Sequence, residues 1–120
     1  MVTILVVDDE PEMLSLVATA LGRSGLEVLK ASSALTALDV CSNADQALGL
    51  VVADFHLAEM TGLQMAEQMC RQRPALEFIF MSGSQQAYEE LVADGHTCVR
   101  KPFSLDELRN AVQRRLETLD

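Results

Sequence analysis

Short apolar runs recur along this chain of 120 residues and are separated by segments with helical periodicity. Three of the runs have no alternation of polar and apolar positions, which is typical of central parallel strands covered on both faces. These runs are residues 4–7, 50–53 and 78–81. Two more mixed segments, residues 26–31 and 97–100, predict strands at the edges of the sheet.

Helical patterns occupy the segments between the predicted strands. In the first, Met13, Val17 and Leu21 recur every fourth residue, after Pro11 and before Gly25. Proline near the start and glycine beyond the end are typical of a helix. Weaker patterns predict helices over residues 34–42, 63–72 and 84–93.

The last segment has the clearest helical pattern in the chain. Ser104 and Glu107 have the spacing of a capping box, which predicts where the helix begins. One face of this helix is apolar, while Arg109 and Gln113 lie on the opposite face. The apolar stripe consists of Leu105, Leu108, Val112, Leu116 and Leu119.

Strand and helix therefore alternate five times along the chain. Parallel strands joined by helices require right-handed crossovers, so we expect a doubly wound α/β sheet with helices on both faces. The sequence contains no repeat, low-complexity tract or linker, and its length suits one domain over residues 1–120.

Chemically useful residues come where the predicted strands end. In parallel sheets of this kind, ligands bind outside the carboxyl ends of the strands. We therefore expect the acids, the hydroxyl and the lysine to gather along one edge. The residues are Asp8 and Asp9, then Asp54, then Ser82 and Gly83, and finally Lys101 followed by Pro102.

The acids among them predict a metal site. Neighbouring parallel strands lie about 4.8 Å apart, so Asp54 converges on the Asp8–Asp9 pair if the first and third strands are adjacent. Carboxylates this close repel one another, which raises some of their pKa values unless a cation joins them. Oxygen ligands without histidine or cysteine favour Mg²⁺, with Mn²⁺ as an alternative.

Charge and cysteine content narrow the classes of partner. Eighteen acids against nine bases give a formal charge of -9, and no basic run offsets it. This balance disfavours unaided binding to nucleic acid or to an anionic membrane, so we expect partners with positive or apolar surfaces. Three widely spaced cysteines, and no apolar run near the roughly 18 residues of a membrane span, favour a cytoplasmic protein.

Taken together, the four motifs resemble the receiver domain of bacterial two-component response regulators, over essentially the whole chain. The resemblance implies a flavodoxin-like fold with five strands in the order 2-1-3-4-5 and five helices. It also implies a phosphorylation site in which Asp54 is the phosphoacceptor. Asp9 would bind magnesium directly and Asp8 through water, and the backbone carbonyl of His56 would be a further ligand. Ser82 and Lys101 would bind the phosphoryl oxygens.

The resemblance also implies a function in signal transduction and phosphorelay. A phosphohistidine on a histidine kinase, or on a histidine phosphotransfer protein, would be the donor. The domain would catalyse its own phosphorylation and slow dephosphorylation without being a conventional turnover enzyme. Phosphorylation would change the surface that binds a downstream protein target, and we expect a monomer or weak dimer.

Three positions depart from the family pattern or vary within it. Cys98 occupies the place of the aromatic that couples to movement of Ser82, so we expect switching to differ there. Ala58 replaces a usual proline, which should loosen the loop after Asp54. His56 would flank the path of the hydrolytic water, and with Gly83 it is a candidate modulator of the phosphoryl lifetime.

The sequence is also compatible with other functions. A degenerate receiver would act as a phosphorylation-independent protein-interaction module, and Cys98 and Ala58 are the features that favour it. A hydrolase of the haloacid dehalogenase type would place an acid two residues after its nucleophile, where this chain has His56. The chain is compatible with a stand-alone regulator, a relay intermediate, or a receiver excised from a hybrid kinase or larger regulator.

Overall fold

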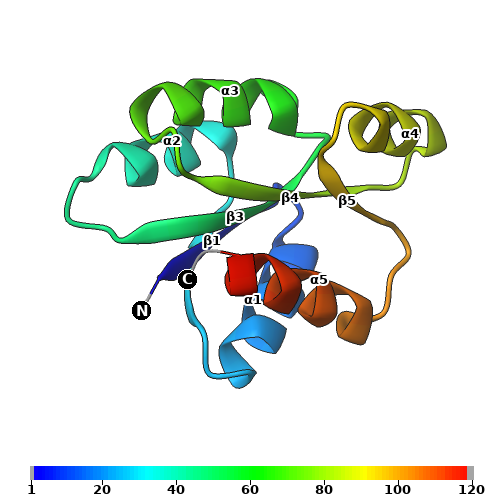
Figure 1. The fold of residues 1–120 in the computed structure, drawn as a ribbon, viewed down its shortest axis with the longest axis horizontal. Coiled ribbons are helices and arrows are strands. Elements are labelled where there is room, and N and C mark those ends of the chain that lie inside the picture. Colours follow the sequence, from blue (N-terminus) through cyan, green and yellow to red (C-terminus); the bar gives the residue numbers. More distant parts are fainter. Residues whose placement is uncertain (1, 119–120) are drawn as a thin grey trace.

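Five parallel strands alternate with five helices in a computed structural model that describes residues 2–118 (Figure 1). None of the helices within these residues has the length and hydropathy needed to cross a bilayer. The strands are β1 (Thr3–Val7), β2 (Glu27–Ala31), β3 (Leu48–Asp54), β4 (Glu77–Ser82) and β5 (Thr97–Arg100). The helices are α1 (Pro11–Arg23), α2 (Ala34–Ser42), α3 (Gly62–Gln72), α4 (Gln85–Ala93) and α5 (Leu105–Thr118).

The strands form a single sheet in the order β2-β1-β3-β4-β5. This order confirms the doubly wound, flavodoxin-like sheet and places β2 and β5 at its edges. Two boundaries differ from the prediction in a way that affects the chemistry. Asp54 pairs with Met81, and Ser82 pairs with Arg100, so both polar residues end their strands instead of following them.

The sheet is covered on both faces because successive strand residues point to opposite sides. Ile4 and Val6 of β1 pack with residues of α1 and α5 on one face. Leu5 and Val7 pack with residues of α2 and α3 on the other face. Figure 1 shows α1 and α5 below the sheet, with α2, α3 and α4 above it.

The helix starts agree closely with the sequence signals. Pro11 is the first residue of α1. Glu107 N–H donates to Ser104 Oγ over 3.1 Å, and Ser104 N–H reaches Glu107 Oε1 at 3.4 Å, which confirms the predicted capping box. Ser84 caps α4 instead of forming its first residue. Leu119, predicted on the stripe of α5, lies outside the described residues.

Candidate active site

The carboxyl ends of β1, β3 and β5 bring two acids and a lysine together. Asp54 ends β3 and Asp8 follows β1, which is the neighbour of β3 in the sheet. Asp8 is fully buried, and Asp54 is only 4 % exposed. Lys101 Nζ lies 3.2 Å from Asp54 Oδ2 and 3.7 Å from Asp8 Oδ2. The predicted gathering of these three residues at one edge is therefore present.

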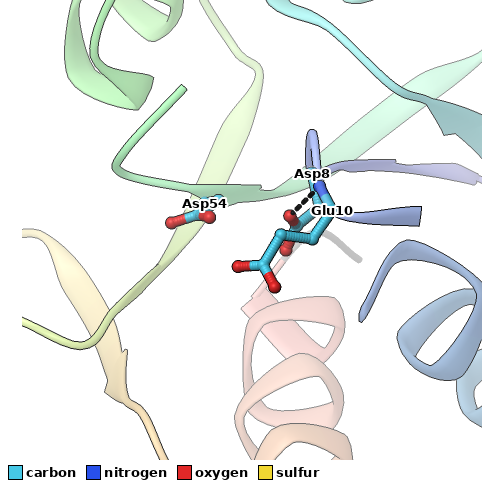
Figure 2. A group of neighbouring side chains, drawn as sticks. All are labelled: Asp8, Glu10 and Asp54. Carbon is cyan, nitrogen blue, oxygen red and sulfur yellow. Dashed lines mark hydrogen bonds between the residues drawn. The ribbon is translucent and has the colours of Figure 1, made fainter. Parts of the chain in front are cut away.

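The third acid of the cluster is Glu10, whereas the sequence predicted Asp9. Carboxylate oxygens of Asp8, Glu10 and Asp54 all lie within 4.8 Å of one another (Figure 2). Glu10 N–H donates to Asp8 Oδ1 over 2.9 Å, which folds the chain after β1 back over the Asp8 side chain. Asp9, between them, is exposed and lies outside this group.

The Asp8 carboxylate is electrostatically strained in this position. Asp8 Oδ2 is buried without a hydrogen-bond partner among the described residues, although Lys101 is nearby. Burial raises the pKa of Asp8, and the charge of Asp54 raises it further. The Glu10 N–H and the Lys101 charge act in the opposite direction. A second cation at this edge would relieve the repulsion that Lys101 leaves uncompensated.

These observations fit a hard divalent cation. The cluster offers only oxygen ligands, and it includes a buried carboxylate oxygen without a partner. Mg²⁺ prefers this donor set and keeps several waters when one or two carboxylates bind it. The direct role of Asp9, the water-mediated role of Asp8 and the role of the His56 carbonyl stay predictions.

Asp8→Asn is expected to stabilise the metal-free protein by about 1–2 kcal/mol at neutral pH, since it removes a buried, poorly paired charge. The folded-state pKa of Asp8 is raised, so the unfolded state loses this proton first as the pH increases. The contribution of Asp8 to metal-free stability therefore falls as the pH rises from about 3.8, the ordinary pKa, through the folded-state pKa, and Asp8→Asn lacks this fall. Urea unfolding between pH 4 and pH 8 measures both effects.

The same titrations with magnesium provide the control. Magnesium should stabilise the wild type by mass action, and the Asp8→Asn variant much less. If wild type and variant gained the same stability from magnesium, Asp8 would not contribute to the metal site. If the metal-free variant were less stable than wild type, the account of Asp8 as a strained charge would be wrong.

Ser82 lies across from Asp54, at the end of β4 and fully buried. Its Oγ accepts a hydrogen bond from Ser84 N–H at 3.1 Å and lies 3.2 Å from His56 Nε2. His56 N–H in turn donates to Asp54 Oδ1 over 3.1 Å. Gly83 is exposed, and a Cβ added there would have Lys101 Cβ at 3.9 Å as its contact within 4 Å among the described residues. The contact between His56 and Ser82 was not predicted from the sequence.

The loop after Asp54 is held by hydrogen bonds in spite of Ala58. Gly62 N–H donates to Phe55 O over 2.6 Å, and His56 and Thr61 form an isolated antiparallel bridge. Glu59 reaches further and accepts a hydrogen bond from Ala34 N–H, at the start of α2, over 3.2 Å. The looser loop that we expect from the missing proline stays a prediction.

Cys98 lies on the edge strand β5. It is half-buried and pairs in register with Phe80, whose ring packs edge-on against His96 at a centroid distance of 5.5 Å. Burial raises the pKa of the Cys98 thiol to about 11, so the thiol stays protonated at neutral pH. Cys98 and Tyr88 are among the residues that line an open hollow of about 380 Å³ between α4 and α5.

Comparisons with known proteins identify the family of the chain. The family model for the response regulator receiver domain matches residues 4–113. The chain is 32% identical to the sensor kinase CckA of Brucella abortus over 98% of this chain and 13% of that protein. It is 31% identical to the probable transcriptional regulatory protein TcrX of Mycobacterium tuberculosis over 89% of this chain and 46% of the relative.

Solved structures give the same result at the level of the fold. A CheY-like receiver domain from Methanospirillum hungatei superposes with a TM-score of 0.87 at 24% identity, over 99% of this chain and 96% of that one. The response regulator TrrA of Thermotoga maritima, solved in complex with Mg²⁺ and BeF, gives a TM-score of 0.82 at 27% identity. That match covers 96% of this chain and 99% of TrrA.

The curated relatives are longer than this chain, which spans between 13% and 46% of the length of the two described above. The match to the family model extends from β1 into α5 and includes every strand end that contributes to the site. The chain therefore belongs to the response regulator receiver domain family.

Proposed function

We propose that Asp54 accepts a phosphoryl group from a phosphohistidine in a magnesium-dependent reaction, as part of two-component signalling. The observation that carries this proposal is the environment of Asp54. Its carboxylate is nearly buried at the end of β3, 3.2 Å from Lys101 Nζ, and shares a cluster with Asp8 and Glu10. A carboxylate held beside positive charge in this way is suited to nucleophilic attack on phosphorus.

The proposed chemistry follows from the charges around Asp54. One carboxylate oxygen attacks phosphorus, the bond from phosphorus to the imidazole nitrogen breaks, and the leaving imidazole keeps the electron pair and takes up a proton. Charge then develops on the equatorial phosphoryl oxygens, where positioned cations and hydrogen-bond donors lower the barrier. Lys101 and the Ser82 hydroxyl would contact those oxygens. Bound magnesium would supply further positive charge there.

The surface beside the site supports docking of a protein donor. An apolar hollow of about 350 Å³ adjoins Lys101, between the first turns of α1 and the start of α5. Leu16, which is 50% exposed, forms part of it. The rest of its apolar lining is Met13, Pro102, Phe103 and Leu105. We propose that a helix of a histidine kinase or histidine phosphotransfer protein packs here and presents its phosphohistidine to Asp54.

Output would begin at Ser82. We propose that its hydroxyl turns toward the phosphoryl group, and that the start of α4 responds because Ser84 N–H is bonded to that hydroxyl. Cys98 cannot transmit this movement as a rotating aromatic ring, so the α4–β5 surface would change through the loop before α4. His56, beside Asp54, would tune the phosphoryl lifetime.

The proposal predicts gain of one phosphoryl group when the protein is treated with acetyl phosphate and magnesium, followed by intact mass. Asp54→Ala should abolish the gain, because it removes the nucleophile, and omission of magnesium should suppress it. Folding of the variant is checked by circular dichroism. No gain by folded wild-type protein would contradict the proposal and favour the phosphorylation-independent interaction module, whose support is the hollow beside Cys98.

A further inference from the structure

Among the described residues, the hydrogen-bond contacts of the Ser82 hydroxyl are with His56 and Ser84, not with Asp54. Ser82 is completely buried, so water does not compete for its hydroxyl. Its oxygen accepts from Ser84 N–H at 3.1 Å and lies 3.2 Å from His56 Nε2. The Asp54 carboxylate, for its part, is bonded to His56 N–H and to Lys101. His56 is thus the residue that touches both the phosphoacceptor and the hydroxyl opposite it.

A serine hydroxyl has one proton to donate and two lone pairs to accept with. If His56 Nε2 accepts, it takes the proton that a phosphoryl oxygen would need. If Nε2–H donates, it occupies the second lone pair, and the Ser82 proton is directed to Ser84 O, 3.5 Å away. In the first tautomer the contact takes up the hydroxyl proton, and in the second it holds the hydroxyl oxygen in place while the proton faces Ser84 O.

We propose that the His56 side chain is a restraint that holds Ser82 in its unphosphorylated position, so that His56 sets how readily this receiver switches. This inference rests on the proposed function and identifies its positioning residue. The phosphoryl group on Asp54 and the imidazole of His56 compete for one hydroxyl. Loss of the imidazole therefore favours the state in which Ser82 binds the phosphoryl group.

The restraint extends from the site to α4 through consecutive hydrogen bonds. Ser82 Oγ binds Ser84 N–H, and Ser84 Oγ accepts from Ala87 N–H at 3.2 Å in the first turn of α4. When Ser82 turns away, Ser84 N–H loses its acceptor at the residue that caps the helix. Through this chain the His56 ring influences the start of α4, even though Cys98 offers no aromatic ring to do so.

The first test uses the unliganded protein. His56→Phe keeps a ring that can pack against Phe55, whose centroid lies 5.0 Å from that of His56, but it removes the nitrogen. The exchange rate of the Ser84 amide hydrogen, measured by NMR, should increase at least threefold in this variant. His96→Phe is the matched control, since His96 packs on Phe80, and the rate should stay as in wild type. Unchanged exchange in His56→Phe would overturn the restraint.

The second test uses beryllofluoride with magnesium as the probe of the phosphorylated state. One hydrogen bond contributes about 0.5–1.5 kcal/mol net, so His56→Phe and His56→Ala should each tighten beryllofluoride binding by roughly two- to tenfold. In a Ser82→Ala background the same substitutions should change the affinity for beryllofluoride less than twofold. The difference between the two backgrounds measures the coupling between His56 and Ser82.

Different results would contradict the proposed function and the restraint by His56. A wild-type protein that takes up no phosphoryl group from acetyl phosphate contradicts the proposed function. Normal uptake, together with equal or weaker beryllofluoride binding in both His56 variants, contradicts this inference alone. A tightening that persists in the Ser82→Ala background would also overturn it, because the effect would then not pass through the hydroxyl.

Discussion

Replacing Lys101 with methionine is expected to slow phosphorylation of Asp54 by about 10²- to 10³-fold, the effect of removing one positioned charge or donor from a developing oxyanion. Lys101 Nζ is the cation that faces both Asp54, at 3.2 Å, and Asp8, at 3.7 Å. Without it, the buried carboxylates also repel an approaching phosphoryl group more strongly. The rate is measured by intact mass over time with acetyl phosphate and saturating magnesium.

A second lysine provides the control for this substitution. Lys30 is exposed on the edge strand β2, and Lys30→Met removes the same charge from the protein as a whole. Its phosphorylation rate should match that of the wild type. If Lys101→Met retained more than a tenth of the wild-type rate while folded, Lys101 would have no substantial part in phosphoryl transfer.

Gly62→Ala is expected to destabilise the protein by about 2–3 kcal/mol, which is typical of severe overpacking. A Cβ at this position would lie 2.5 Å from the backbone oxygen of Asp54 and 3.1 Å from Phe55 Cα. Both contacts are with backbone, and Gly62 N–H is bonded to Phe55 O, so no flexible side chain can move aside. The free energy of unfolding is measured in urea.

The same substitution should also slow phosphorylation, because the backbone that must shift carries Asp54 itself. Gly22→Ala in α1 is the matched control, since its added Cβ meets no atom within 4 Å. There alanine should stabilise the helix by about 0.5–1 kcal/mol. If the two substitutions had equal effects, the close approach of Gly62 to the backbone of Asp54 would not be the reason that position 62 requires glycine.

The fold was largely predictable because its signals are local. The apolar runs without alternation predicted central strands, and the strand order β2-β1-β3-β4-β5 places the more mixed segments at the edges. The resemblance to receiver domains supplied the order itself. The strand ends were less predictable, since Asp54 and Ser82 extend β3 and β4 through ladder pairing with neighbouring strands. Periodicity along one segment carries no information about such pairing.

The site residues that lie at the ends of strands could be predicted from the sequence. Asp8, Asp54 and Lys101 meet because β1, β3 and β5 end at one edge of the sheet. Which acid completes the cluster depends on the turn after β1, where the hydrogen bond to Asp8 Oδ1 brings Glu10 back over the site. The acid directly after the Asp8–Asp9 pair was the available signal, but residue type alone does not give the direction of its side chain.

The contact between His56 and Ser82 could not be predicted from the sequence either. The two residues are 26 positions apart and meet because β3 and β4 are neighbours and end side by side. The prediction that His56 tunes the site was based on its place near Asp54. The contact between His56 and Ser82 is seen only in the side-chain geometry. It offers a physical mechanism by which His56 would tune the site.

The measurement that tests the central claim most directly is the location of the phosphoryl group. Protein phosphorylated by acetyl phosphate and magnesium is reduced with borohydride, which converts an aspartyl phosphate to homoserine, and is then mapped by peptide mass spectrometry. The account predicts homoserine at position 54 and unmodified Ser82 and His56. A phosphoryl group retained on serine or histidine, or homoserine at Asp8 or Asp9 instead of Asp54, would contradict it.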